Sequence, residues 1–212
     1  MASYTLRGRK VAILLAPAGT EQIEFTEPKK AVEEAGAAVD VIGAQAGSAR
    51  TYHHDLDPGQ TFTVDKTFDE VSADDYDALL VPGGTVGADK LRGDAAAVRL
   101  VRGFFGAGKP VGVICHGPWT LVEADVVRGR TLTSWPTLAT DIRNAGGTWV
   151  DQEVVTDQGL VTSSKPDDLP ACAAYRPARR WTMARADVPV GILTRRAFPR
   201  RGRSRAARGR LR

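Results

Sequence analysis

The chain has 212 residues, of which 42% are hydrophobic and 25% are charged, values typical of a soluble globular domain with a full core. No apolar run approaches the roughly 20 residues that a membrane-spanning helix needs, and residues 1–10 lack the apolar segment of a signal peptide. The two cysteines, Cys115 and Cys172, are too few for a disulfide scaffold. We therefore expect a cytoplasmic protein without a membrane partner.

Charge is distributed unevenly along the chain. The net charge is +4, but residues 176–212 hold 13 arginines and one acid, Asp187, which gives that segment +12 and leaves −8 for residues 1–175. Its prolines and its apolar residues without period predict a disordered tail, and its composition also resembles out-of-frame translation of GC-rich coding sequence. We expect a domain over residues 1–174 and a basic tail over 175–212. Nucleic-acid binding is not expected, and only this tail could contribute it.

The domain begins with a predicted βαβ unit. Residues 10–16 form an apolar run that predicts a buried parallel strand. Thr20 can cap a helix from about residue 21 to residue 35, and Gly36 can end it. Residues 37–42 supply the second strand. The loop after the first strand lacks a G-x-G-x-x-G motif, so no dinucleotide site is expected.

The rest of the domain continues to alternate strands and helices. The expected elements are an edge strand at 60–64, a core strand at 78–81, a helix at 94–105, a strand at 111–114, a short helix at 119–123, a strand at 131–133, a helix at 136–145, a strand at 148–150, and a hairpin of 154–156 with 160–162. This order predicts an α/β fold, a doubly wound and mostly parallel sheet flanked by helices, as in flavodoxin-like and class I glutamine amidotransferase-like sandwiches. Ligands of such sheets bind at the carboxyl ends of the strands.

The stretch 110–118, Pro-Val-Gly-Val-Ile-Cys-His-Gly-Pro, places Cys115 at the tip of a buried strand. Gly117 suits a sharp strand-to-helix turn in which a side chain would clash. Such an elbow presents a nucleophile at the carboxyl edge of a sheet, and the dipole of the next helix would lower the pKa of the thiol. The alternative is a small buried hydrophobic residue, since free cysteine is commonly interior. The turn chemistry favours the nucleophile.

A cysteine nucleophile needs a base or an orienting acid. Of the three histidines, only His116 follows Cys115, whereas papain-like enzymes and class I glutamine amidotransferases need a histidine well downstream. Both classes are therefore excluded, and a Cys–His pair must use either His116 or the weakly placed pair His53-His54. Because neighbouring residues at an elbow point in different directions, His116 is either an unusually arranged base or a structural residue beneath the turn.

Three further residues could complete a site at this edge. Glu21, in the first loop, could reach the thiol or could simply favour the helix dipole. Gly83 and Gly84 end the third strand, where backbone N–H groups could form an oxyanion site or belong to a plain tight turn. No spacing of histidine, cysteine and acidic residues predicts a metal site, so we expect neither a metal nor a cofactor.

Taken together, these motifs resemble the DJ-1/PfpI family, in particular its PfpI-like bacterial branch. The resemblance covers about residues 8–172 and rests on Gly19-Thr-Glu-Gln-Ile-Glu24, Val81-Pro-Gly-Gly84, Asp89-Lys-Leu-Arg92, Ile114-Cys-His-Gly-Pro118, Leu132-Thr-Ser-Trp-Pro136 and Asn144-Ala-Gly-Gly147. The family's final helix is expected to be replaced here by the basic tail.

The resemblance implies a role for each matched residue. Cys115 corresponds to the reactive cysteine, His116 to the histidine that follows it, and Glu21 to the glutamate that hydrogen-bonds with the thiol. Asp89 corresponds to the acid that reaches the histidine from a neighbouring subunit in PfpI-type oligomers, although aspartate has a shorter reach than glutamate. Gly84, with the Cys115-His116 turn, corresponds to the oxyanion site. A homodimer or higher homo-oligomer with the site near the interface is therefore expected.

The resemblance also implies a stress-related enzyme whose thiolate attacks carbonyl groups. The activities of the family include glutathione-independent conversion of methylglyoxal to lactate, repair of glyoxal adducts on amino groups, and peptide hydrolysis. We expect small aldehydes or glycated adducts as substrates. The alternatives are an intracellular cysteine peptidase and a non-catalytic redox sensor or chaperone, because an exposed thiolate beside a stabilising acid is also readily oxidised.

Overall fold

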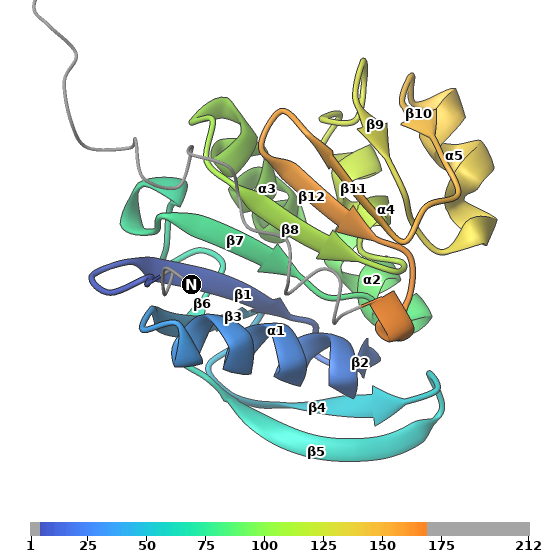
Figure 1. Cartoon of the computed structure of the whole chain (residues 1–212). Coiled ribbons are helices and arrows are strands. Elements are labelled where there is room, and N and C mark those ends of the chain that lie inside the picture. Colours follow the sequence, from blue (N-terminus) through green and yellow to red (C-terminus); the bar gives the residue numbers. More distant parts are fainter. Residues whose placement is uncertain (1–4, 169–212) are drawn as a thin grey trace, which may run out of the picture.

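The computed structural model of the protein describes residues 5–168, which are built around a seven-stranded sheet (Figure 1). Its strands lie in the order β11 (Val154–Asp157), β12 (Leu160–Ser163), β8 (Val111–Ile114), β7 (Ala78–Val81), β1 (Lys10–Leu15), β3 (Ala38–Gly43) and β6 (Lys66–Thr67). All neighbours pair in parallel except β11, which runs antiparallel to β12. The prediction of a doubly wound, mostly parallel α/β sheet is confirmed.

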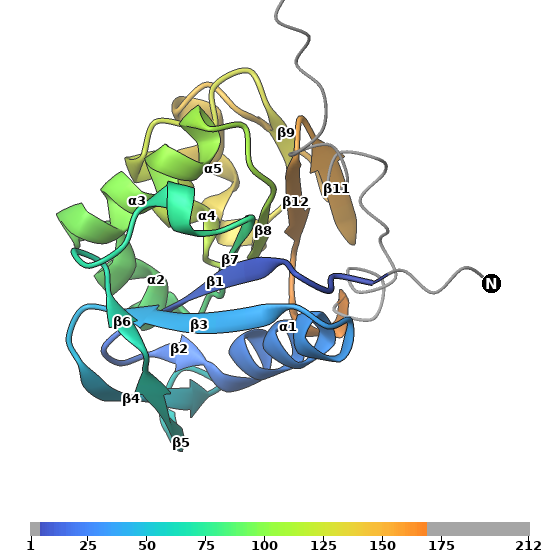
Figure 2. The same cartoon turned by 90° about the vertical axis from the view of Figure 1, so that its left-hand side faces the viewer.

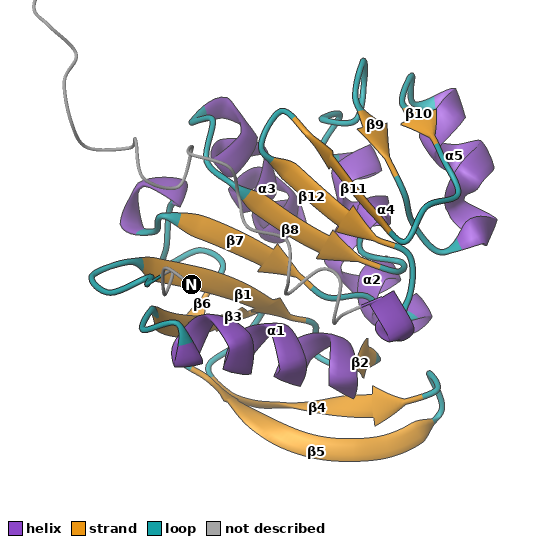
Figure 3. Ribbon diagram, in the orientation of Figure 1, coloured by secondary structure: helices purple, strands orange, loops and turns teal. Residues whose placement is uncertain are grey.

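Helices cover both faces of this sheet. The helix α1 (Gln22–Glu34) lies on one face, and α2 (Thr85–Arg92), α3 (Ala95–Gly106), α4 (Pro118–Glu123) and α5 (Ala139–Asn144) lie on the other (Figures 1 and 2). Short 3-10 turns occur at η1 (Ala73–Asp75), η2 (Pro136–Leu138) and η3 (Pro166–Asp168). Figure 3 shows that the loops after β7 and β8 leave the sheet at the same edge.

Two small sheets flank the main one. The first joins β2 (Thr20–Glu21), β4 (Gly47–His53) and β5 (Asp57–Val64), and the second joins β9 (Thr131–Leu132) to β10 (Thr148–Trp149). The long hairpin of β4 and β5 extends the edge strand expected at 60–64. Because β2 follows β1 and pairs in parallel with β4, this pairing carries the tip of the hairpin toward the carboxyl edge of the main sheet.

The place of β1 inside the sheet, between β7 and β3, explains why its sequence is apolar without alternation. Its side chains from residue 11 to residue 15 are fully buried, as expected of a strand covered on both faces. Ala12 and Leu14 belong to the large core under α3 and α4. Ile13 and Leu15 pack with Phe25 of α1 on the other face.

Two local predictions differ from the structure. Thr20 does not cap α1: it lies in β2, its hydroxyl accepts the Ala16 N–H at 3.1 Å, and Glu21 is the N-cap without a side-chain cap bond. The helix α2 was not predicted, because its sequence contains Gly87, a poor helix former. Glycine is needed there, since an added Cβ would lie 2.6 Å from the Gly19 carbonyl oxygen.

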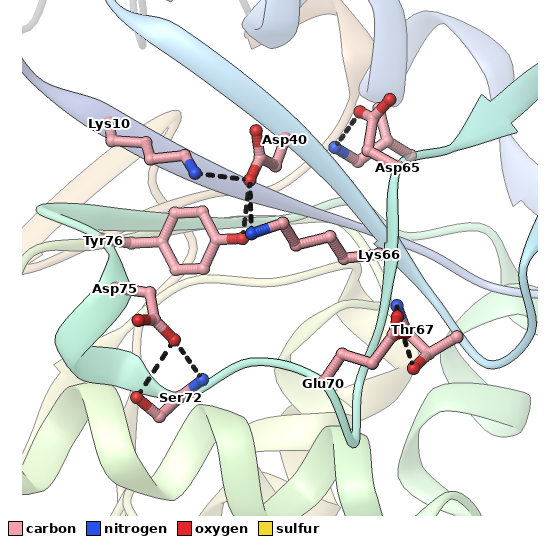
Figure 4. A network of polar contacts seen from close by, with 10 residues as sticks. Lys10, Asp40, Asp65, Lys66, Thr67, Glu70, Ser72, Asp75 and Tyr76 are labelled. Atoms are coloured by element: carbon pink, nitrogen blue, oxygen red, sulfur yellow. Dashed lines mark hydrogen bonds and ion pairs between the residues drawn. The ribbon is translucent and has the colours of Figure 1, made fainter.

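A polar network joins side chains of β1, β3 and β6 to Tyr76, the residue that follows the turn η1 (Figure 4). Asp40 accepts a hydrogen bond from the Tyr76 hydroxyl at 2.8 Å and pairs with Lys10 at 2.7 Å and Lys66 at 3.8 Å. Burial and the hydrogen bond to Asp40 raise the pKa of Tyr76. The phenol therefore remains a donor, and we assign this network to holding the sheet edge together.

Some predictions concern residues outside the described range. The basic tail at 175–212 and Cys172 both lie beyond residue 168. Within residues 5–168, no helix combines the length and the apolar character needed to cross a membrane.

Candidate active site

Cys115 occupies a strained turn between β8 and α4. Its φ is +58°, in the left-handed region that non-glycine residues rarely adopt. A Cβ added at Gly117 would lie 2.7 Å from Val113 Cγ1 and 2.9 Å from the Ile114 carbonyl oxygen, so only glycine fits there. The Cys115 N–H is bound to the Ser163 carbonyl at 3.0 Å. The elbow predicted from the sequence is thus confirmed, and it fixes the direction of the thiol.

His116 turns its ring toward the thiol of its own neighbour. Its Nδ1 lies 3.2 Å from Cys115 Sγ, and its ring packs against the indoles of Trp119 and Trp135, with centroids 5.4 and 5.8 Å away. The side chain is buried, and burial lowers the pKa of the imidazole. The negative charge of Asp55 acts in the opposite direction but has the smaller effect. The imidazole is therefore neutral near pH 7 and can accept a proton.

The carboxyl group beside the Cys115 thiol is that of Glu24. This corrects the expectation that Glu21 hydrogen-bonds with the thiol. Glu24 is 1% exposed, hydrogen-bonds with Cys115 and accepts the Gly83 N–H at 2.8 Å. Glu21 precedes the helix in β2, and its carboxylate accepts the Asp55 N–H at 3.4 Å instead. The signal for Glu24 was its neighbour Phe25, which shares the buried face of α1.

Burial raises the pKa of Glu24 to about 8, although its hydrogen bonds with Cys115 and Gly83 oppose the shift. The nearby charges of Glu21 and Asp55 raise it further. At neutral pH Glu24 is therefore mostly protonated and can donate a hydrogen bond or a proton.

The expected lowering of the thiol pKa by a helix dipole is also corrected. Burial raises the pKa of the Cys115 thiol, and Glu24 adds to this effect once it is ionised. The backbone N–H groups of Gly84 and His116 point at the sulfur and act in the opposite direction. Because α4 has only six residues and Cys115 is 6% exposed, desolvation dominates. The resting group is a thiol, whose proton must be transferred when it reacts.

The two glycines after β7 have different roles in the geometry. The Gly83 N–H is already bound to Glu24, so it is not free to bind a substrate oxygen, which corrects the expectation for Gly83. Gly84 has a φ of +84° and directs its N–H toward the sulfur. Once a carbonyl carbon has bonded to the sulfur, its oxygen would lie within reach of the backbone N–H groups of Gly84 and His116.

Asp89 and Asp55 differ from the expected arrangement of acids. Asp89 is exposed on α2, and among the described residues its side chain has no hydrogen bond or ion pair. Its expected contact with the histidine of a neighbouring subunit stays a prediction.

Asp55, which sequence reasoning did not select, reaches the site from the tip of the β4–β5 hairpin and binds Thr85. A turn of weak sequence signal, far from Cys115 in the chain, gave no means of finding it.

Metal-ligating side chains do not gather at this site. Between residues 5 and 168, no group of three or more histidine, cysteine or acidic side chains could hold a metal ion. The chemistry supported by the described residues is that of a thiol, an imidazole, a protonated carboxyl and backbone N–H groups.

Comparisons with known proteins place the chain in a family. The DJ-1/PfpI family matches residues 9–175. Over 164 residues the chain is 46% identical to "Protein/nucleic acid deglycase 2" of Escherichia coli (strain K12), covering 77% of this chain and 92% of that protein. Over 163 residues it is 40% identical to "Putative cysteine protease YraA" of Bacillus subtilis (strain 168), covering 77% and 93%.

A solved structure from Anabaena variabilis, a two-domain protein with DJ-1/ThiJ/PfpI-like and ferritin-like domains, superposes with a TM-score of 0.73 at 33% identity. The match covers 78% of this chain and 46% of that one. The family match over residues 9–175, the 46% identity to a curated relative and the superposition on a solved structure lead to one conclusion: the chain belongs to the DJ-1/PfpI family.

Proposed function

We propose that this protein is a cysteine-dependent enzyme that attacks the carbonyl groups of small aldehydes and of their adducts on amino groups, as a glutathione-independent glyoxalase or deglycase. The observation that carries the proposal is the contact of Cys115 Sγ with His116 Nδ1 at 3.2 Å, with the raised-pKa carboxyl of Glu24 on the same sulfur. Nucleophile, base and acid thus meet at one atom.

The first step forms a hemithioacetal. His116 Nδ1 takes the thiol proton, and Sγ bonds to the aldehyde carbon of methylglyoxal. The electron pair of the carbonyl moves to its oxygen, which the Gly84 N–H stabilises, and the imidazolium then protonates that oxygen. In a glycated amine the attacked carbon is a hemiaminal, so Sγ displaces the amine instead: the C–N bond breaks with its electron pair on nitrogen, the imidazolium gives that nitrogen the former thiol proton, and the same hemithioacetal remains.

The second step moves a hydrogen between the two carbons. His116 removes the proton on the carbon bonded to sulfur while Glu24 donates its proton to the neighbouring carbonyl oxygen, which gives an enediol. The imidazolium then protonates the second carbon, and the hydroxyl on the first returns its proton to Glu24. The product is a lactoyl thioester, which water hydrolyses to lactate with release of the thiol.

Burial of the nucleophile favours small substrates over proteins. Cys115 is 6% exposed, so a carbonyl reaches it only at the end of a slender group, as in an aldehyde or a side-chain adduct. The deglycase name of the 46% identical relative supports this class. The redox-sensor alternative is disfavoured because oxidation follows exposed thiolates of low pKa, whereas burial raises the pKa of this thiol.

The test is methylglyoxal consumption and lactate formation by the purified protein. Cys115→Ala should abolish lactate formation, and Cys172→Ala, a control for general loss of a cysteine, should keep it. Full activity in Cys115→Ala would refute the proposal. Hydrolysis of unmodified peptides without lactate formation would favour instead the peptidase suggested by the name of the Bacillus subtilis relative.

A further inference from the structure

We infer that Asp55 is a positioning residue that fixes the tautomer of His116 through the hydroxyl of Thr85, within a single chain. The inference rests on the proposed function, because it explains how His116 Nδ1 stays free to take the thiol proton. It assigns a role to the β4–β5 hairpin, whose tip contributes no group that contacts the sulfur.

The contacts form a continuous line from the hairpin to the thiol. Asp55 Oδ1 accepts the Thr85 backbone N–H at 2.6 Å, and Asp55 Oδ2 accepts the Thr85 hydroxyl at 2.8 Å. Thr85 Oγ1 in turn lies 3.4 Å from His116 Nε2. On the other side of the ring, Nδ1 faces Cys115 Sγ at 3.2 Å.

The direction of each hydrogen bond follows from the number of protons. A carboxylate only accepts, so Thr85 must give its single hydroxyl proton to Asp55. The Thr85 oxygen can then only accept from the ring, which requires the proton of neutral His116 to be on Nε2. Nδ1 is left with a free lone pair toward the thiol, the arrangement that a general base requires.

The hairpin is built to hold Asp55 in this place. His54 and Asp55 both have positive φ, at 52° and 65°, an unfavourable backbone for non-glycine residues. The Asp55 N–H is held by Glu21 at 3.4 Å, and β4 is held by its pairing with β2. A strained turn retained beside a nucleophile is expected where side-chain direction matters.

Asp55→Asn tests the inference because it changes protons while keeping shape. The amide oxygen is needed by the Thr85 N–H, so the amide NH₂ faces the Thr85 hydroxyl and donates to it. Thr85 then donates its own proton to His116 Nε2, which moves the ring proton to Nδ1 and blocks the base. Asp57→Asn is the matched control, since Asp57 is exposed on the same hairpin.

The primary readout is nitrogen NMR of isotope-labelled histidine, which distinguishes the two tautomers without any substrate. The chain has three histidines, so the signal of His116 can be assigned. We expect the Nε2–H form in the wild type and in Asp57→Asn, and the Nδ1–H form in Asp55→Asn. A wild type with the proton on Nδ1, or an Asp55→Asn variant with the wild-type tautomer, would overturn the inference.

Kinetics give the second readout. Asp55→Asn should lower kcat by about tenfold or more with little change in KM, Thr85→Val should act in the same direction, and Thr85→Ser should restore the activity. A loss of activity without a change of tautomer would show a merely structural role and would reject the inference. If the wild type forms no lactate, the proposed function fails, but the NMR comparison still decides the role of Asp55.

Discussion

The carboxyl of Glu24 and the thiol of Cys115 meet across the carboxyl edge of the sheet, one from the first turn of α1 and the other from the elbow after β8. The Glu24 carboxyl has little access to water, because it accepts the Gly83 N–H at 2.8 Å and lies beside a buried sulfur. Its pKa is therefore raised to about 8, and its proton is available to the reaction at neutral pH.

Turnover should depend on Glu24 and much less on Glu21. Glu24→Gln keeps the shape and a hydrogen-bond donor but has no proton to transfer, so kcat should fall by about a hundredfold or more. Glu21→Gln should change kcat by less than about tenfold, because Glu21 supports the Asp55 backbone and influences Glu24 through its charge alone. Lactate formation under saturating methylglyoxal measures both, and equal losses in the two variants would contradict the assignment.

Activity should fall as the pH rises through about 8. The carboxyl of Glu24 loses its proton there, which removes the acid and places a negative charge beside the sulfur. His116 adds no loss on this side, because burial lowers its pKa and keeps it neutral. The kcat profile between pH 6 and pH 10 tests this expectation, and a kcat that rises across that range would show that the ionised carboxyl is the active form.

Stability should also depend on the proton of Glu24. The folded state keeps this proton up to about pH 8, whereas the unfolded chain loses it near the ordinary glutamate pKa of 4.5. Between these values only the folded state binds the proton. The free energy of unfolding therefore falls as the pH rises, by about 1.4 kcal/mol per pH unit and by at most about 5 kcal/mol in all. Below the unfolded pKa this loss is absent.

Glu24→Gln should remove the contribution of this proton to the pH dependence of the free energy of unfolding, measured by urea unfolding from pH 4.5 to pH 8. Glu27→Gln, an exposed position on the same helix, is the control and should keep the wild-type slope. Identical slopes in the wild type and Glu24→Gln would mean that Glu24 titrates normally in the folded protein.

Gly84 should tolerate no side chain. A Cβ there would lie 2.3 Å from the Gly19 carbonyl oxygen, and the φ of +84° is unfavourable for alanine. Gly84→Ala should therefore destabilise the fold by about 2 kcal/mol or more. Gly106→Ala is the control: no atom lies within 4 Å of its added Cβ, and a helical site should gain about 0.5–1 kcal/mol. Equal unfolding midpoints would contradict the close approach of the two loops.

The sequence allowed the sheet and the elbow to be predicted because each depends on local rules. An unbroken apolar run such as 10–16 identifies a strand buried on both faces, and Gly117 after Cys115 identifies a turn without room for a side chain. The helix α2 was missed because Gly87 serves the packing against Gly19 at the expense of helix propensity.

The site was predicted less completely because its acids are placed by tertiary structure. Glu21 and Glu24 are one helical turn apart, and only the true start of α1 at Gln22 decides which carboxyl is buried. Asp55 reaches the site through the pairing of β4 with β2, a contact between segments that no local pattern connects. That an acid would lie beside the thiol could be anticipated, whereas its identity as Glu24 required the fold.

The central claim is that the Cys115 sulfur bonds to the aldehyde carbon, and the most direct test is carbon NMR of isotope-labelled methylglyoxal bound to Glu24→Gln. In this variant the first step remains and the second is blocked. The account predicts a protein-bound hemithioacetal carbon and little lactate, with the bound signal absent when Cys115 is also replaced by alanine. A signal that persists without Cys115, or lactate formed without Cys115, would contradict it.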